Sequence, residues 1–291
     1  MKLVTFLHRD TVKAGFIDGE DVVVCAEGPS ADTAVLDLIA SGDEGVSRWN
    51  GMAGSADRLP LKDVRLLPPM PRLVRDVICV GKNYHAHAKE FHNSGFDSSG
   101  KEETPTVPVI FTKAMTGLIG PGEAIRSEVD PTGTIDFEGE LGVVIGKKAA
   151  RVSKEDAMDY VFGFVIVNDM TSRELQRRHS QWTIGKGLDT FCPMGPWIAT
   201  ADEMPDLPGV MLQTFVNGEE RQRATMADLI FDIPTIIETL TATGTLLPGD
   251  VIATGTPAGV GIGFNPPRYL KAGDSVKIEI TNLGVLENPV A

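Results

Sequence analysis

A proline-rich segment near residue 70 is the feature that most restricts how this chain can fold. Residues 66–71 read Leu-Leu-Pro-Pro-Met-Pro. Proline fixes its backbone angle and has no N–H to donate, so this segment cannot continue a helix or a central strand. The 291 residues are enough for one large and one small folded unit. We therefore predict a small N-terminal module over residues 1–70 and a larger domain over residues 71–291.

Short strands dominate the predicted secondary structure on both sides of this break. Two dipeptides with strong hairpin propensity, Asp18-Gly19 and Asn217-Gly218, each interrupt a strand-like pattern. Many short strands with few helices are typical of a strand-rich α+β fold. Strands are expected at residues 2–8, 13–25, 77–80, 137–145 and 161–167, helices at residues 34–40 and 233–243, and a long loop at residues 91–108.

Charge and composition exclude several classes of function. The formal net charge of −13 argues against a nucleic-acid partner, because the phosphates would be repelled. It leaves room for a small anionic substrate, since a metal ion or a few placed cations can reverse the local sign. The three cysteines form no CxxC pair, the N-terminal apolar stretch is too short for a signal peptide, and no long apolar run occurs. We expect a cytoplasmic protein without membrane spans.

Residues 136–146 alternate acidic and apolar side chains. On a strand, alternate residues share a face, so the apolar side chains would point to the core. Asp136, Glu138 and Glu140 would then form a row on the other face. Such a row requires either open water or a cation, because like charges repel. Both interpretations, a solvated strand face and a cation site, fit the alternation.

A further acid favours the cation. The apolar run at residues 161–167 has the composition of a buried strand and ends in Asn168-Asp169. Polar residues at strand ends are common in active sites. Two glutamates and an aspartate offer hard oxygen ligands, which suit Mg2+ or Mn2+ better than zinc. Glu138, Glu140 and Asp169 are therefore the candidate metal ligands.

Three polar residues follow this acid. Arg173 and Gln176 are three apart on a predicted helix and share one face, either near the metal or as surface residues. Lys186 stands in a Gly-Lys-Gly sequence among hydrophobic residues, so its ammonium can be partly buried and directed at an oxyanion.

A glycine-rich segment covers residues 255–263. Asn-Pro-Pro follows it at residues 265–267 where a dinucleotide site would have a helix, which predicts a substrate-lining turn and not a dinucleotide site.

A histidine pair provides a candidate base. His87 and Glu90 are three residues apart, so one helical turn brings them into contact. A carboxylate beside an imidazole orients it and favours proton uptake, as a general base requires. A chance pair on a surface helix is the competing interpretation, and His85 is a rival base or ligand.

Taken together, these segments resemble the fumarylacetoacetate hydrolase superfamily from about residue 76 to the end. Each string alone is weak evidence, but all of them occur in the order found in that family. The strings are VGKNYHAHAKE, PVIFTKAMTGLIGPG, DFEGELGVVIG, VNDMTSRELQ, GKGLDTFCPMGPW, GDVIATGTPAGVG and LKAGDSVKIEI.

The resemblance implies a fold, a cofactor and residue roles. The implied fold is a mixed β-sandwich roll, usually a homodimer, that uses Mg2+, with Mn2+ or Ca2+ as alternatives. Lys113 matches a recurrent lysine without an assigned role. Glu138, Glu140 and Asp169 correspond to metal ligands, His87 and Glu90 to a water-activating pair, Lys186 to an oxyanion-stabilising lysine, and Arg173, Gln176 and Thr256 to substrate-binding residues.

The implied activity is metal-dependent hydrolysis of a carbon–carbon bond in a small 1,3-diketo or acylpyruvate-type acid. The spacing of His87 and Glu90 resembles the bacterial branch, which also contains 2-oxo acid decarboxylases and enol–keto isomerases. Decarboxylation or tautomerisation at the same metal site is therefore the alternative. A non-catalytic acid-binding protein of the same fold is a third hypothesis.

Overall fold

A computed structural model describes residues 1–97, 102–179 and 181–291. Of the loop predicted over residues 91–108, residues 98–101 lie outside the described part. Within the described ranges, strands make up most of the regular structure and helices are few, which confirms the strand-rich α+β prediction. None of the helices in these ranges has the length and apolar character to cross a membrane.

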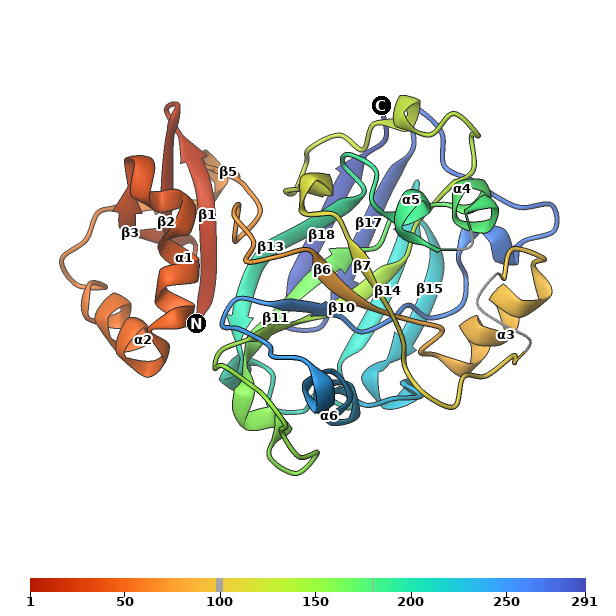
Figure 1. Cartoon of the computed structure of the whole chain (residues 1–291). Helices are drawn as coiled ribbons and strands as arrows, with labels where there is room; N and C mark the ends of the chain where they lie inside the picture. The colour runs from red at the N-terminus through yellow and green to blue at the C-terminus, as the bar shows by residue number, and fades with distance from the viewer. Residues whose placement is uncertain (98–101, 180) are drawn as a thin grey trace.

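The N-terminal module is a small antiparallel sheet covered by two helices, and it lies at one side of the molecule (Figure 1). The predicted hairpin is present but displaced by one residue: Asp18 pairs with Asp21, and the turn residues are Gly19, with a positive φ of 65°, and Glu20. β1 also pairs with β13 of the larger part, with Lys2 opposite Ala199, so one sheet runs through both parts. The elements are β1 (Lys2–His8), β2 (Thr11–Asp18), β3 (Asp21–Glu27), α1 (Ala31–Ala40), α2 (Gly42–Gly51), β4 (Arg58–Pro60) and β5 (Arg65–Leu66).

The large sheet has the strand order β4-β3-β2-β1-β13-β11-β10-β16-β6-β7. Two short strands pair outside this order, β5 on β1 and β8 on β13. β10 and β11 lie in the interior of the sheet and are antiparallel. Strands of the larger part are β6 (Val77–Gly81), β7 (Val109–Lys113), β8 (Leu118–Ile119), β10 (Gly139–Ile145), β11 (Val161–Asn168), β13 (Cys192–Thr200) and β16 (Val251–Ala253).

A four-stranded sheet, ordered β15-β14-β17-β18, packs against one face of the large sheet. Leu141 and Val143 of β10 share this core with Ile278 of the second sheet and Ile236 of α6. The predicted hairpin at Asn217-Gly218 is present, and both residues have positive φ, as a type I′ turn requires. The elements are β14 (Met211–Val216), β15 (Glu219–Thr225), α6 (Ile233–Thr243), β17 (Ser275–Ile280) and β18 (Gly284–Pro289).

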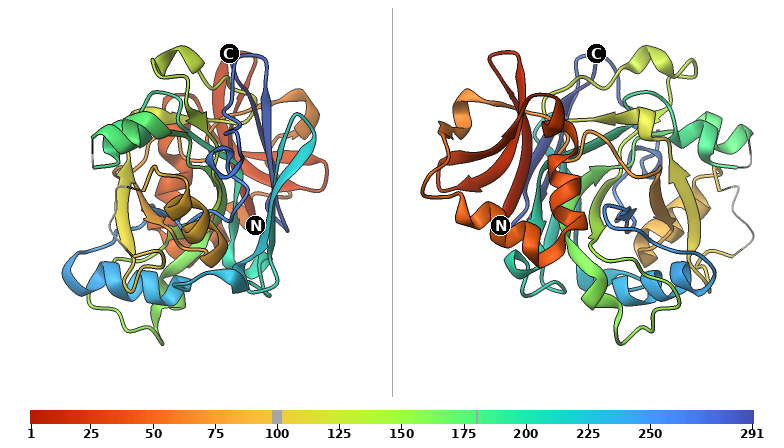
Figure 2. Two further views of the ribbon diagram at one scale, coloured as in Figure 1. Left: turned by 90° about the vertical axis from the view of Figure 1, so that its right-hand side faces the viewer. Right: turned by 60° about the vertical axis from the view of Figure 1, so that its left-hand side comes forward.

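Short elements surround the point where β11 ends and β10 begins. The two-stranded β9–β12 pairing comes directly before α4, and α3 lies at the side of the molecule opposite the N-terminal module (Figure 1). α3 faces the viewer in the left view of Figure 2. These elements are α3 (His85–Asn93), β9 (Ile135–Asp136), β12 (Thr171–Ser172), α4 (Arg173–Arg178) and α5 (Thr183–Lys186).

Candidate active site and metal centre

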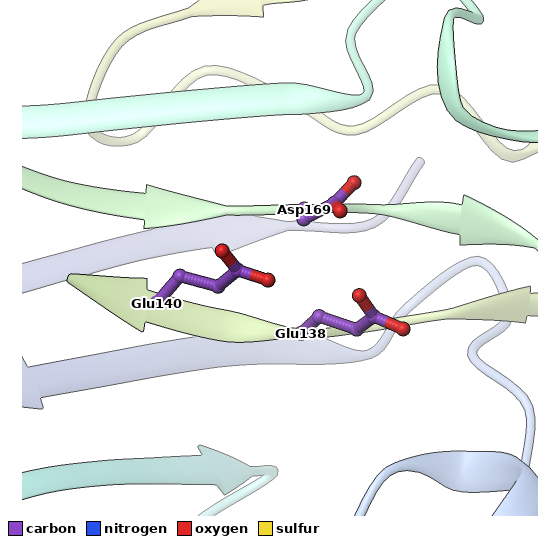
Figure 3. A group of neighbouring side chains, drawn as sticks. All are labelled: Glu138, Glu140 and Asp169. Atoms are coloured by element: carbon purple, nitrogen blue, oxygen red, sulfur yellow. The ribbon is translucent and has the colours of Figure 1, made fainter. Parts of the chain in front are cut away.

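Strand pairing brings the three predicted metal ligands together. Gly139 of β10 lies opposite Asn168 of β11, and the backbone N–H of Asp169 donates to the carbonyl oxygen of Glu138 at 2.8 Å. One carboxylate oxygen from each of Glu138, Glu140 and Asp169 lies within 4.8 Å of the other two. Figure 3 shows the three side chains on these neighbouring segments. All three are buried, so the solvated-face interpretation is wrong.

Two cations neutralise Glu138. Lys186 places its Nζ 2.7 Å from Oε2 of Glu138 and 2.8 Å from Oδ2 of Asp169, and Arg173 places an Nη 2.7 Å from Oε1 of Glu138. Burial alone would raise the pKa of Glu138, but attraction by Lys186 and then Arg173 lowers this pKa to about 2. Glu138 is therefore ionised.

Glu140 has a different environment. Its carboxylate accepts a hydrogen bond from the backbone N–H of Gly255 at 2.8 Å, and among the described residues no lysine, arginine or histidine forms an ion pair with it. Burial, followed by repulsion from Asp169 and Glu138, raises the pKa of Glu140 well above its usual range. A divalent cation held by these three acids would remove this destabilisation, and an all-oxygen donor set suits Mg2+, Mn2+ or Ca2+. The residues present therefore fit the predicted metal.

Asp136 does not join this cluster, although the alternation placed it in the same row. Its Oδ2 lies 2.9 Å from Nε of Arg173, and its two oxygens accept the backbone N–H groups of Gly261 and Ile262 at 2.6 Å and 3.0 Å. Arg173 also donates to Oε1 of Gln176 at 3.2 Å. Because Arg173 and Gln176 are each only 1% exposed, the interpretation of these two as surface residues is wrong.

α3 holds the histidine pair in the predicted contact. Nδ1 of His87 lies 3.1 Å from Oε2 of Glu90, and Oε1 of Glu90 accepts the backbone N–H of Gly259 at 3.0 Å. Glu90 therefore fixes the ring of His87 to the glycine-rich turn 169 residues further along the chain. His87 is buried, which excludes the chance surface pair, whereas His85 is exposed and does not line the cavity.

The backbone of the glycine-rich turn donates hydrogen bonds to three carboxylates. Its N–H groups bind Glu140, Glu90 and Asp136, and Gly255 and Gly259 have positive φ. Thr256 donates through Oγ1 to the carbonyl oxygen of Gly139 at 3.0 Å. The turn ends in a short 3-10 helix, Gly261–Gly263, and no α-helix follows it among the described residues, which agrees with the prediction that this is not a dinucleotide site.

One cavity lies beside these groups, and neither Glu90 nor Asp169 is among the residues that line it. The sequence did not single out several of its walls, which are Lys82 and the aromatic side chains of Phe91, Phe111 and Trp182. Helical spacing could have indicated Phe91, because it lies four residues after His87 on α3. The predicted site residues that line the cavity are His87, Glu138, Glu140, Arg173, Gln176, Lys186 and Thr256.

Two family models match this chain, and the boundary between them lies near the proline-rich segment at residues 66–71. Residues 76–291 match the model of the fumarylacetoacetate (FAA) hydrolase C-terminal family. Residues 1–69 match the model of the Rv2993c-like N-terminal family. The predicted superfamily is therefore confirmed.

Relatives and solved structures differ in the activities that they are named for. The chain is 42% identical to oxaloacetate tautomerase YisK of Bacillus subtilis over 266 residues, which cover 88% of this chain and 86% of that protein. Its structure is similar to a fumarylacetoacetate hydrolase from Exiguobacterium antarcticum, with a TM-score of 0.83, 38% identity, and coverage of 100% and 99% of the two chains. A maleylpyruvate hydrolase from Sphingobium sp. SYK-6 in complex with manganese(II) and pyruvate has a TM-score of 0.79, 30% identity, and coverage of 100% and 99%.

Proposed function

Because the chain belongs to the fumarylacetoacetate hydrolase family, we propose that it is a divalent-metal-dependent enzyme that interconverts the keto and enol forms of a small anionic 2-oxo acid. One observation carries the proposal: three buried acids converge, and one of them, Glu140, has no ion-pair partner among the described residues. Glu138 and Glu140 line the same cavity as His87 and Lys186. Identity of 42% to an oxaloacetate tautomerase favours a substrate of the oxaloacetate type.

The acids, His87 and Lys186 have different proposed roles in this reaction. Glu138, Glu140 and Asp169 would hold Mg2+, with Mn2+ or Ca2+ as alternatives, and such an ion would supply Lewis acidity to a bound oxo acid. His87, oriented by Glu90, moves a proton between the carbon beside the carbonyl and the carbonyl oxygen. The ammonium of Lys186 stabilises the negative charge that develops on that oxygen.

Arg173, Gln176 and Thr256 line the same cavity and are the proposed substrate-binding residues. The guanidinium of Arg173 is already bound to Asp136 and Glu138, so its position in the cavity wall is fixed.

Hydrolysis of a carbon–carbon bond in an acylpyruvate-type acid is the second candidate. The likeness to a maleylpyruvate hydrolase that binds manganese(II) and pyruvate favours it. In this reaction His87 would take a proton from water, the hydroxide would add to a carbonyl carbon, and the leaving fragment would depart as an enolate and then take up a proton. Decarboxylation of an oxo acid would use the same stabilised enolate.

A substrate panel with and without Mg2+ tests the proposal. Enol–keto conversion of oxaloacetate is followed by ultraviolet absorbance, and release of pyruvate or carbon dioxide is measured in parallel with acylpyruvates and oxaloacetate. The proposal requires Mg2+-dependent acceleration of enol–keto conversion, lowered ~10²–10⁴-fold in His87→Ala. Pyruvate release from acylpyruvates without any tautomerase activity would establish the second candidate instead.

Assembly and location complete the proposal. We propose that the chain is cytoplasmic and forms a homodimer, and that it binds the small-molecule substrate. Analytical ultracentrifugation of the purified chain tests the dimer, and a sedimenting species of 31.2 kDa would refute it.

A further inference from the structure

Lys113 is a buried cation that the proposed chemistry does not use. It ends β7 and is 0% exposed. It does not line the cavity, so it cannot contact a substrate there. A lysine is rarely buried completely unless its charge is paired, and the partners of this one indicate its role.

The ammonium group of Lys113 has three hydrogens, and three oxygen atoms surround it. Nζ lies 2.7 Å from Oδ1 of Asp169 and 2.9 Å from the carbonyl oxygen of Met170, and it also donates to the carbonyl oxygen of Lys186. Two donors of the ammonium therefore bind backbone carbonyl oxygens, and its charge is paired with the carboxylate of Asp169. The contact with Lys186 lies at the C-terminus of α5, where a cation stabilises the terminal carbonyl groups.

These partners belong to two functional segments. Asp169 is a proposed metal ligand, and the backbone of Lys186 carries the proposed oxyanion-stabilising ammonium. Lys113 occupies one oxygen of Asp169, while Nζ of Lys186 binds the other at 2.8 Å. A single side chain thus fixes both the orientation of the Asp169 carboxylate and the main chain from which Lys186 projects.

We propose that Lys113 is a positioning residue that sets Asp169 and Lys186 for metal binding and charge stabilisation. This inference rests on the proposed function. Groups that orient metal ligands are worth about 10–100-fold in metal affinity. The direction of the change in metal affinity distinguishes this role from simple electrostatics. Loss of a positive charge beside Asp169 would by itself tighten cation binding, whereas loss of positioning weakens it.

The test uses Lys113→Met, with Lys113→Gln as a second variant that keeps hydrogen-bond donors without the charge. Lys13→Met is the matched control, because Lys13 is a mostly buried strand lysine paired with Glu27 at 2.6 Å in the N-terminal module. Binding of Mn2+ alone is measured by calorimetry, thermal unfolding reports the fold, and kcat and KM are measured at saturating metal. We expect Mn2+ affinity to fall at least about tenfold in both Lys113 variants, with a lower kcat at saturating metal, and to stay unchanged in the control.

Unchanged or tighter Mn2+ binding in a folded Lys113 variant overturns the proposal. If neither variant shows a cooperative unfolding transition, the lysine supports the fold rather than the site, and the proposal is equally overturned. Mn2+ binding by the wild-type chain without turnover of any oxo acid would refute the proposed reaction and leave the positioning role standing. A wild-type chain that binds no Mn2+ would refute both.

Discussion

Replacing Gly263 with alanine should disable the His87 base while the chain stays folded. A Cβ atom at residue 263 would lie 1.8 Å from Oε1 of Glu90, so this carboxyl group must move by about 1.6 Å to reach the 3.4 Å of an ordinary contact. That movement breaks the hydrogen bond from Gly259 at 3.0 Å and removes the partner of His87 at 3.1 Å. The imidazole then loses the group that orients it.

The size of the effect follows from this displacement. A misplacement of about 1 Å can cost ~10² in rate, and complete loss of a general base costs ~10²–10⁴. We therefore expect kcat of Gly263→Ala to fall by about 10². The free energy of unfolding should change by no more than about 1 kcal/mol, because the flexible end of a half-buried side chain gives way rather than the backbone.

The assay compares Gly263→Ala with Gly54→Ala by turnover, thermal unfolding and Mn2+ affinity. Gly54 is the control because its added Cβ would meet nothing within 4 Å. Mn2+ affinity should be unchanged in both variants, since Glu90 is not among the proposed metal ligands. Wild-type turnover in a folded Gly263→Ala enzyme would refute the idea that Glu90 positions the base.

Three further predictions follow from single residues. Because the pKa of Glu140 is raised by burial, Mn2+ binding should release a proton and strengthen with rising pH, and calorimetry in buffers of different ionisation enthalpy checks this. Glu140→Gln should abolish Mn2+ binding. It should also stabilise the metal-free protein at pH values above the ordinary glutamate pKa, because the carboxyl group of Glu140 loses stability for the fold as pH rises through its raised pKa. An unchanged melting temperature would contradict this. Asp232→Ala should lower the free energy of unfolding by about 1 kcal/mol without changing turnover, because Asp232 caps α6 by accepting the N–H of Thr235 at 2.9 Å. Hydrogen bonds to Asp232 outweigh the effect of its burial and lower its pKa, so this loss of stability should shrink as pH falls through the lowered pKa. Thermal unfolding across pH measures both effects.

Features with a local cause could be predicted from the sequence. The two predicted hairpins depend on residues that accept positive φ, and the structure contains both, with positive φ at Gly19, Asn217 and Gly218. The first turn lies one residue later than predicted, because Asp18 pairs with Asp21. The contact between His87 and Glu90 depends only on helical spacing. α2 was missed because its sequence is polar and rich in glycine, and its anchor in the core, Trp49, gives no repeated apolar pattern.

Features that depend on distant partners could not be predicted. The alternation in β10 left a solvated face and a cation site equally open, since burial of Glu138 and Glu140 arises from pairing with β11 and from the turn near residue 255. Asp136 was placed with the wrong neighbours for the same reason, because its partners Gly261 and Ile262 lie 125 and 126 residues away. The contacts of Lys113 span 57 and 73 residues.

The charges around the cavity explain how so acidic a chain could attract an anion. Four buried acids, Asp136, Glu138, Glu140 and Asp169, lie beside three buried cations, Lys113, Arg173 and Lys186. The raised pKa of Glu140 favours its neutral form when no metal is bound, so the metal-free cluster is close to neutral. A bound divalent cation would favour the ionised form of Glu140 and leave the cluster with a net positive charge. The net charge of −13 therefore describes the chain as a whole, whereas the sign inside the cavity is set by the metal. It follows that the oxo acid should bind strongly only after the metal, and measurable binding of oxaloacetate to the metal-free chain would contradict this order.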